Sequence, residues 1–153
     1  MALAMSSFFK YNEQTMIHIK DIEKALSDIN CCMMSTIDEN GQINSRPMLH
    51  NKAIGYNDRN LYFFSMKDTR KVRDIKKNPT ISLTYQNTEN TLFIQIHGKA
   101  KLCEKPEEMA PYWDKKLDLW WSQRENTPQI CMIHIHVSWI RYWNQGKDCT
   151  IEL

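Results

Sequence analysis

The sequence predicts a mostly β fold, either a barrel or an α+β sheet, in which antiparallel strands carry the core and the helices stand apart. Six or more segments have the alternation or the short apolar runs of strands, and polar turns separate them. Only three segments have helical spacing, and they do not alternate with the strands as in a doubly wound fold. At 153 residues, the chain is long enough to bury one core, so we expect a single domain over residues 1–153.

The first third of the chain predicts a helix followed by a hairpin. Residues 1–14 have no period and are expected to form a loosely ordered lead-in. From Met16 to Ile29, apolar residues recur at helical spacing, which indicates an amphipathic helix that packs on a sheet. Cys31–Ile37 is expected to be a buried strand and Gln42–Asn51 its returning partner, because Asn40-Gly41 between them is a strong hairpin-turn signal.

The middle of the chain predicts two more strands around a short helix. Leu61–Ser65 is the third strand, and a helix from about Arg70 to Asn78 is stopped by Pro79. Thr80–Gln86 is the fourth strand. Leu92–Cys103 is a long fifth strand, since its residues alternate over most of its length.

The last part of the chain predicts a bend, a helix and two strands. Gly98 is the expected site of a bend in the fifth strand. A helix from Pro106 to Trp120 is expected, with Pro111 either near its first turn or splitting it. Ile130–Val137 alternates strictly, and a last strand is expected around Ile140–Trp143.

Composition excludes several classes of protein. The net charge of +2 arises from 20 basic and 18 acidic residues spread along the chain, which gives no reason to expect nucleic-acid binding. No apolar run approaches the roughly 18 residues that span a membrane, so no membrane association is expected. The cysteines are odd in number and lack Cys-x-x-Cys spacing, which favours reduced thiols in the cytoplasm; they are Cys31, Cys32, Cys103, Cys131 and Cys149.

A strand, a loop and a helix start meet in the segment from Phe63 to Val72. Arg70 and Lys71 fall in the first helical turn, where a positive charge opposes the helix dipole unless an anion is bound. Together with the hydroxyls of Ser65 and Thr69 and the free helix amides, they would form a phosphate-binding site. An equally compatible interpretation is a solvated basic face continued by Arg73, Lys76 and Lys77.

Arg46-Pro47-Met48 is the second unusual feature. Arginine and proline within a strand are typical of an edge that faces a ligand or a bulge, and Arg46 could then reach the same phosphate. On its own, the triplet fits as well with an exposed edge strand protected from pairing by charge and proline.

These motifs, in their order and spacing, resemble a known family. The chain resembles the pyridoxamine 5'-phosphate oxidase-like FMN-binding split barrels, especially the general stress protein 26 subfamily. The resemblance runs over most of the chain, through Ile19–Ile29, Ser45-Arg46-Pro47-Met48, Leu61–Ser65, Thr69-Arg70-Lys71-Val72, Asn78-Pro79, Gly98-Lys99-Ala100 and Tyr142-Trp143.

The resemblance implies a six-stranded antiparallel split β-barrel that forms a homodimer, with FMN in each of two clefts between subunits. Arg46 and Lys71 match the family positions that bind the FMN phosphate, and Ser65 and Arg70 match supporting contacts. The strand from Arg46 to Leu49 would lie along the isoalloxazine edge, with Phe64 beside it. The expected cofactor-binding residues are therefore Arg46, Pro47, Met48, Leu49, Phe64, Ser65, Thr69, Arg70 and Lys71.

Three departures from the family pattern argue against vitamin B6 oxidation. Asn51 stands where the true oxidases have a lysine that binds the substrate phosphate. The chain ends at Leu153, before the segment that completes the vitamin site in those enzymes. Phe93 replaces a flavin-contacting glutamine, so the contacts to the ring are expected to differ as well.

The leading functional hypothesis is a flavin-dependent oxidoreductase that uses FMN for hydride or electron transfer with a small-molecule substrate or a donor such as NAD(P)H. No residue stands out as a catalytic acid or base. A flavin-binding or flavin-sequestering stress protein without turnover is the alternative, and FAD, a deazaflavin or haem could occupy the same groove.

Other residues invite chemical interpretations that we set against structural ones. His134 and His136 share a strand face at a spacing that can chelate a metal, but no third ligand is evident and an exposed or interfacial face is favoured. Cys31 and Cys32 are expected to be small core or near-core residues on opposite strand faces. Trp120 and Trp121 either overhang the flavin cleft or pack in the core, where at least three of the five tryptophans are expected.

Overall fold

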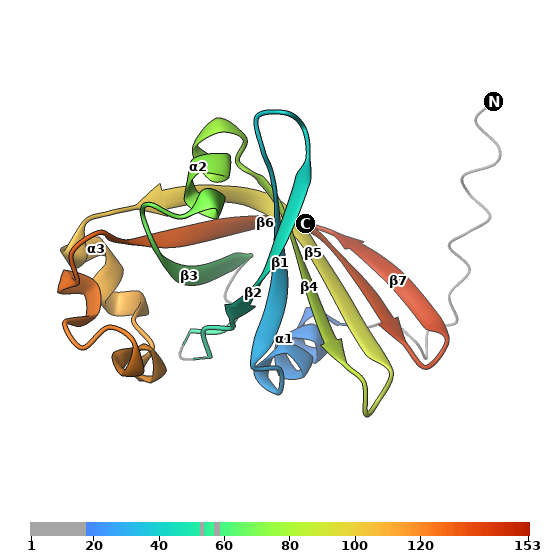
Figure 1. Ribbon diagram of the computed structural model, residues 1–153. Coiled ribbons are helices and arrows are strands. Elements are labelled where there is room, and N and C mark those ends of the chain that lie inside the picture. The colour runs from blue at the N-terminus through green and yellow to red at the C-terminus, as the bar shows by residue number, and fades with distance from the viewer. Residues whose placement is uncertain (1–17, 53, 57–58) are drawn as a thin grey trace.

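The computed structural model describes residues 18–52, 54–56 and 59–153, in which seven strands form one antiparallel sheet. The sheet curls strongly, and the helices lie to its sides rather than alternating with the strands (Figure 1). The predicted class is therefore confirmed. Along the sheet, the strands are β2 (Ile43–Leu49), β1 (Cys31–Ile37), β4 (Thr80–Asn87), β5 (Leu92–Cys103), β6 (Ile130–Asn144) and β3 (Asn60–Met66), and β7 (Lys147–Glu152) also pairs with β6.

The hairpin of β1 and β2 is built by one aspartate. The Asp38 carboxylate accepts hydrogen bonds from the backbone N–H groups of Asn40 (2.9 Å) and Gln42 (3.0 Å). Gly41 follows with a φ of +76°, a conformation that side chains disfavour. The predicted turn is confirmed, and β2 becomes an edge strand that pairs only with β1 in the described part of the chain.

Gly98 produces the bend expected in β5. The register of β5 against β6 shifts between His97 and Gly98, and a Cβ atom at Gly98 would lie 2.3 Å from the carbonyl oxygen of His136. Only glycine allows the two backbones to approach this closely. The bulge increases the local curvature of the two longest strands.

Two hydrophobic clusters hold the fold together. The larger lies inside the curled sheet, where helix α1 (Ile19–Ser27) buries Ile22 and Leu26 completely. The smaller packs beneath the irregular segment between β5 and β6; its members are Tyr62, Phe64, Met109, Trp113, Leu117, Ile130 and Met132. Helix α2 (Arg70–Lys77) joins β3 to β4 as predicted, and buries Val72 and Ile75.

The prediction of one helix from Pro106 to Trp120 is wrong, and the alternative that Pro111 splits it is confirmed. Helix α3 (Pro106–Met109) ends after one turn, because Pro111 offers no backbone N–H and obstructs helix continuation. The Asp114 side chain then accepts a hydrogen bond from the Lys116 N–H and starts a separate turn. The segment continues as three 3₁₀ helices, η2 (Ala110–Tyr112), η3 (Lys115–Leu119) and η4 (Arg124–Asn126).

The two last strands also differ from prediction. Ile130–Val137 and Ile140–Trp143 are one continuous strand, β6, because Trp139 pairs with His97 of β5 and Glu152 of β7, and Ser138 continues the strand as the extra residue of the bulge opposite Gly98. A tight turn at Gly146, with a φ of +79°, then leads into β7, which was not predicted. The expected lead-in of residues 1–14 lies outside the described residues. Among the residues the structure does describe, no helix is long and apolar enough to cross a membrane.

Candidate functional site

A cavity of about 450 Å³ opens where the curled sheet brings its two edge strands toward each other. β2 pairs with β1, and β3 pairs with β6, so the cavity lies at a seam that no ladder closes in the described residues. We call it the seam cavity. It is lined by Pro47, Met48 and Leu49 of β2, Phe64, Ser65 and Met66 of β3, Thr69 and Lys71 at the start of α2, and Leu117, Trp120 and Trp121.

Hydroxyl groups and helix amides form one end of the seam cavity. The hydroxyl oxygens of Ser65 and Thr69 are 3.2 Å apart, and Thr69 donates to the carbonyl of Met66 at 2.9 Å. Thr69 is also the N-cap of α2, whose first turn contains no carboxylate. The first amides of a helix lack partners within the helix and carry partial positive charge. This end of the cavity is therefore suited to an anion.

Lys71 adds a full positive charge to the same end. Its side chain is half-buried and forms no hydrogen bond or ion pair within the described part of the chain. Burial lowers the pKa of the Lys71 ammonium, and the nearby charge of Arg46 lowers it further. A bound anion would relieve both effects, because it would replace lost solvation and offset the repulsion between the two cations.

Arg46 is directed toward a buried carboxylate beside the cavity. Its guanidinium donates to Thr36 Oγ1 (2.8 Å) and to the carbonyl of Met34 (3.2 Å), and lies 3.7 Å from Asp74 Oδ2. Burial lowers the pKa of Arg46, and Asp74 opposes that shift. Thr36 in turn donates to Asp74 at 2.7 Å, so the arginine is held in a defined position.

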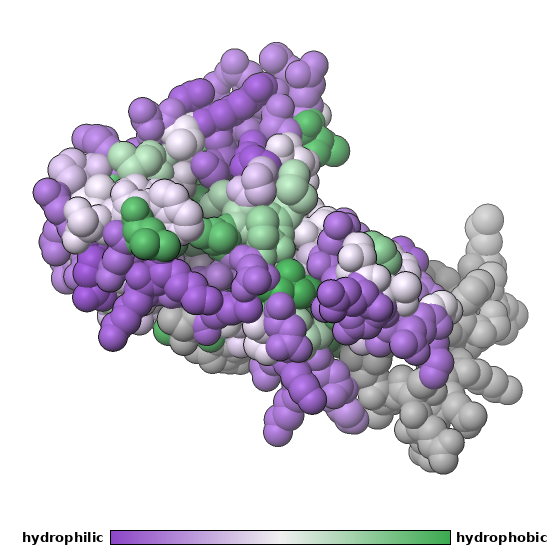
Figure 2. All heavy atoms as spheres, turned by 60° about the horizontal axis from the view of Figure 1, so that its bottom comes forward, coloured by the Kyte–Doolittle hydropathy of each residue, from purple (hydrophilic) through white to green (hydrophobic). Residues whose placement is uncertain are grey.

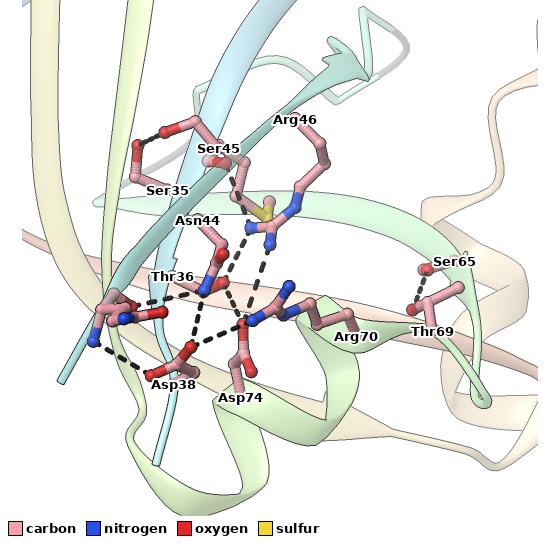
Figure 3. A network of polar contacts seen from close by, with 12 residues as sticks. Ser35, Thr36, Asp38, Asn44, Ser45, Arg46, Ser65, Thr69, Arg70 and Asp74 are labelled. Atoms are coloured by element: carbon pink, nitrogen blue, oxygen red, sulfur yellow. Dashed lines mark hydrogen bonds and ion pairs between the residues drawn. The ribbon is translucent and has the colours of Figure 1, made fainter. Parts of the chain in front are cut away.

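Arg70 belongs to the same polar network and not to the cavity lining. Its guanidinium donates to Asp38 Oδ2 at 3.0 Å. Figure 3 shows the head groups of Arg46 and Arg70 near the two aspartates, and the Ser65–Thr69 pair well apart from them. The structure thus brings seven of the nine predicted residues together around the seam cavity and places the two arginines in the adjoining network.

Aromatic residues from the irregular segment form the other wall. Trp120 is 59% exposed, and Trp121 packs edge-on against Trp113 with ring centroids 6.2 Å apart. Of the five tryptophans only Trp113 is fully buried, so the prediction of three or more in the core is wrong. Met66 and Leu117 also line the cavity, and no sequence signal indicated them.

The other chemically suggestive residues have local partners. His134 Nε2 lies 2.7 Å from Asn60 Oδ1, and its ring stacks on Tyr62. In the described ranges no three His, Cys, Asp or Glu side chains come close enough to hold a metal. Cys31 and Cys32 do face opposite sides of β1, but Cys31 is exposed, which corrects its assignment to the core region.

Comparison with known sequences identifies relatives of this chain. A family model described as "Pyridoxamine 5'-phosphate oxidase like" matches residues 18–153. General stress protein 26 of Bacillus subtilis is 25% identical over 96 residues, which make up 61% of this chain and 68% of that protein.

Solved structures share the fold. A protein related to general stress protein 26 from Clostridium acetobutylicum superimposes with a TM-score of 0.77 at 18% identity, over 88% of this chain and 94% of that one. General stress protein 26 from Bacillus anthracis gives a TM-score of 0.70 at 21% identity, and the superposition covers 90% of this chain and 100% of that protein. These likenesses confirm the antiparallel six-stranded split barrel with few helices.

Proposed function

The chain belongs to the pyridoxamine 5'-phosphate oxidase-like family, and from this we propose that its seam cavity binds FMN for use in oxidoreductase chemistry. The bound flavin would supply hydride or electron transfer, and the protein would bind and orient it. The observation that carries the proposal is Lys71, a half-buried ammonium without a described counter-charge, beside two hydroxyls and a helix start.

The polar end of the cavity would hold the phosphate. Lys71, Ser65 and Thr69 would contact it directly, together with the free amides of α2. Arg46 would add favourable charge at longer range from its place beside Asp74. In this arrangement Arg70 supports the site by fixing the hairpin through Asp38.

The flavin ring would occupy the apolar end. Pro47, Met48 and Leu49 lie on β2, which pairs with one strand only in the described part of the chain, so its outer edge could hydrogen-bond with a ligand. Phe64 and Trp120 offer aromatic surface on the other sides. The described residues that line the cavity include no carboxylate and no histidine, which agrees with chemistry left to the cofactor.

Titration of the apoprotein with FMN tests this proposal. Lys71→Ala should weaken FMN binding by about 1.5–3 kcal/mol, the scale of a charge-assisted hydrogen bond. Lys67→Ala is the matched control, because Lys67 lies in the same loop region but pairs with Glu104 at 3.0 Å. Equal FMN affinity in the wild type and the Lys71 variant would overturn the assignment of the phosphate site.

A flavin-binding stress protein without turnover is the second candidate function, and it is favoured by the likeness to general stress protein 26. Reduction of the bound flavin by NADH or NADPH distinguishes the two. A rate well above that of free FMN would establish an enzyme, and equal rates would favour the binding protein. Spectra and mass of the released cofactor would identify FAD, a deazaflavin or haem in its place.

We further propose a homodimer formed through the outer face of the sheet. Met33, Leu49 and Phe93 are 42%, 44% and 39% exposed, unusually high for large apolar strand residues. The strand register places all three on the same face. In the view of Figure 2, hydrophobic surface gathers in the middle of the molecule between hydrophilic regions.

The dimer is tested by measuring the mass of the protein with light scattering as it elutes from a size-exclusion column. Met33→Glu should shift the mass toward the monomer, because a buried charge in an apolar interface is unfavourable. Leu119→Glu should leave the dimer intact, since Leu119 is 86% exposed on η3 and not on the sheet face. A wild-type protein that is monomeric at micromolar concentration would contradict the proposal.

The proposed location is the cytoplasm, in keeping with five free cysteines.

A further inference from the structure

The outward side of the sheet carries no formal charge over four neighbouring strands. Its residues are the odd-numbered ones of β2 and β1, the even-numbered ones of β4, and the odd-numbered ones of β5 up to His97. None of them is Asp, Glu, Lys or Arg. We call this surface the uncharged face. The centres of interfaces between protein chains are depleted of charged residues, so a second copy of this chain is the occupant that suits it.

His97 is the one histidine on the uncharged face. It lies in a row with Ser35 and Ser82, which the strand register places side by side on β1 and β4. Its ring is half-buried and lies parallel to the ring of Trp139, with centroids 5.1 Å apart and an interplanar angle of 4°. Its Nδ1 is enclosed and has no hydrogen-bond partner among the described residues. Stacking on Trp139 therefore fixes the ring, and no acceptor within the described chain awaits a second N–H.

The charged side chains on this side of the sheet all lie beyond the uncharged face, toward β6 and β7. On the face itself, the only other ionisable side chain is the thiol of Cys31. A hollow of about 190 Å³ between His97 and β1 has no charged residue in its described lining. The ionisable side chains nearest to His97 along the sheet are Lys99 of β5, His136 and Arg141 of β6, and Asp148 and Glu152 of β7.

The partners of these groups leave no carboxylate for His97. Arg141 pairs with Asp148 at 3.1 Å, and Glu152 lies opposite Trp139, one strand farther from the histidine. Lys99 donates to Thr80 Oγ1 at 2.6 Å and adds a like charge on the same strand. An imidazolium at His97 would thus depend on solvent and on the face of Trp139.

A second copy would remove that solvent without replacing it. In a closed dimer with two-fold symmetry, the same surface of both chains meets. Each His97 would then face side chains of the partner that include no carboxylate. A charge buried without a partner is unfavourable, and a neutral imidazole avoids it by keeping Nδ1 free of hydrogen.

We propose that His97 makes the homodimer sensitive to pH, because the neutral imidazole permits association through the uncharged face and the imidazolium favours the separate chains. The inference rests on the homodimer of the proposed function. In this scheme the dimer binds fewer protons than two separate chains, so a lower pH shifts the equilibrium toward the separate chains. Each dimer has two such histidines, so one unit of pH changes the Kd of the dimer by at most about 100-fold.

Sedimentation equilibrium of the full chain measures this Kd at pH 7.5 and 5.5, on either side of about 6.5, where histidine side chains ordinarily titrate. The Kd of the wild type should rise about 10- to 100-fold at the lower pH. His97→Gln stays neutral and should dimerise equally at both values. His97→Lys is charged at both values and should be mostly monomeric at both.

His136→Gln is the matched control, because His136 is an exposed histidine of the neighbouring strand outside the uncharged face. This variant should keep the rise in Kd. Circular dichroism of each protein at pH 5.5 separates dissociation from acid unfolding. A rise that persists in His97→Gln, or that is lost equally in His136→Gln, would overturn the proposal.

The wild type at pH 7.5 separates failure of this inference from failure of the dimer. A monomer at that pH would overturn the homodimer and the inference together. A dimer whose Kd is the same at both values would overturn the inference alone. FMN titration at pH 7.5 tests the flavin site independently of either result.

Discussion

The imidazole of His50 stands perpendicular to the ring of Tyr85, at an interplanar angle of 89° and with Nδ1 3.2 Å from the phenol oxygen. Both side chains are buried, and Tyr85 is fully enclosed. The protonated imidazolium would therefore lose its hydration without gaining a carboxylate partner at hydrogen-bond distance among the described residues. The position of this ring links the stability of the core to pH.

We expect the protein to lose stability as pH falls through the range between about 6.5 and 4. The folded-state pKa of His50 is lowered to about 4, so the unfolded chain binds more protons in this window. The contribution is fully present above about pH 6.5 and amounts to about 3 kcal/mol at most. Urea unfolding of wild type and His50→Phe at pH 7, 5.5 and 4.5 measures it. The free energy of unfolding of the wild type, relative to that of the variant, should decrease as the pH is lowered from 7 to 4.5. A difference between the two proteins that does not change with pH would contradict the assignment.

Replacing Gly98 by alanine should destabilise the sheet by about 1–3 kcal/mol, the usual effect of overpacking. The added Cβ would meet the backbone carbonyl of His136 at 2.3 Å, and neither strand can move without breaking the β5–β6 register. Thermal unfolding provides the measurement. Gly41→Asn is the control, because the turn there is open and asparagine tolerates a positive φ.

Asp74→Asn should lower the free energy of unfolding by about 1–3 kcal/mol. The substitution removes the negative charge next to Arg46 and weakens the acceptor for the Thr36 hydroxyl. Glu104→Gln removes a carboxylate of similar size from a surface pair with Lys67, and should change stability by less than about 0.5 kcal/mol. Denaturant titration of both variants makes the comparison, and equal effects would show that Asp74 does not support the arginine.

FMN should stabilise the protein more than riboflavin, which lacks the phosphate. At a hundredfold excess over its Kd, FMN should add about 2.7 kcal/mol to the free energy of unfolding. The affinity preference of the wild type for FMN should be roughly 10- to 150-fold. Lys71→Ala should remove most of this preference, and a preference that survives the substitution would place the phosphate elsewhere.

Local signals in the sequence predicted most of the fold. The Asn40-Gly41 turn, the alternation in Leu92–Cys103 and the position of Gly98 each depend on near neighbours, and each is confirmed. The segment after Pro106 was wrong because its helical spacing competes with Pro111 and with the Asp114 cap. β7 was missed although Cys149, Ile151 and Leu153 alternate with polar residues, because the segment is only six residues long, and its pairing with β6 makes it a strand.

The candidate site was predicted in part for a similar reason. Their closeness in the sequence predicts that Ser65, Thr69 and Lys71 lie near the start of one helix. In the structure all three line the cavity. The directions of Arg46 and Arg70 depend on Asp74 and Asp38, which are distant in sequence and gave no signal. His97 was likewise missed, because its enclosed Nδ1 and its uncharged surroundings become apparent only once the strands are paired.

The seam between β2 and β3 has a mechanical consequence. On one side of the cavity β2 pairs with β1, and on the other side β3 pairs with β6. No described ladder joins β2 to β3. The gap can therefore widen or narrow as the sheet flexes, with every strand-to-strand hydrogen bond intact. The same barrel could then clamp flat molecules of differing thickness, and the rigidity of the fold need not restrict which of them it accepts.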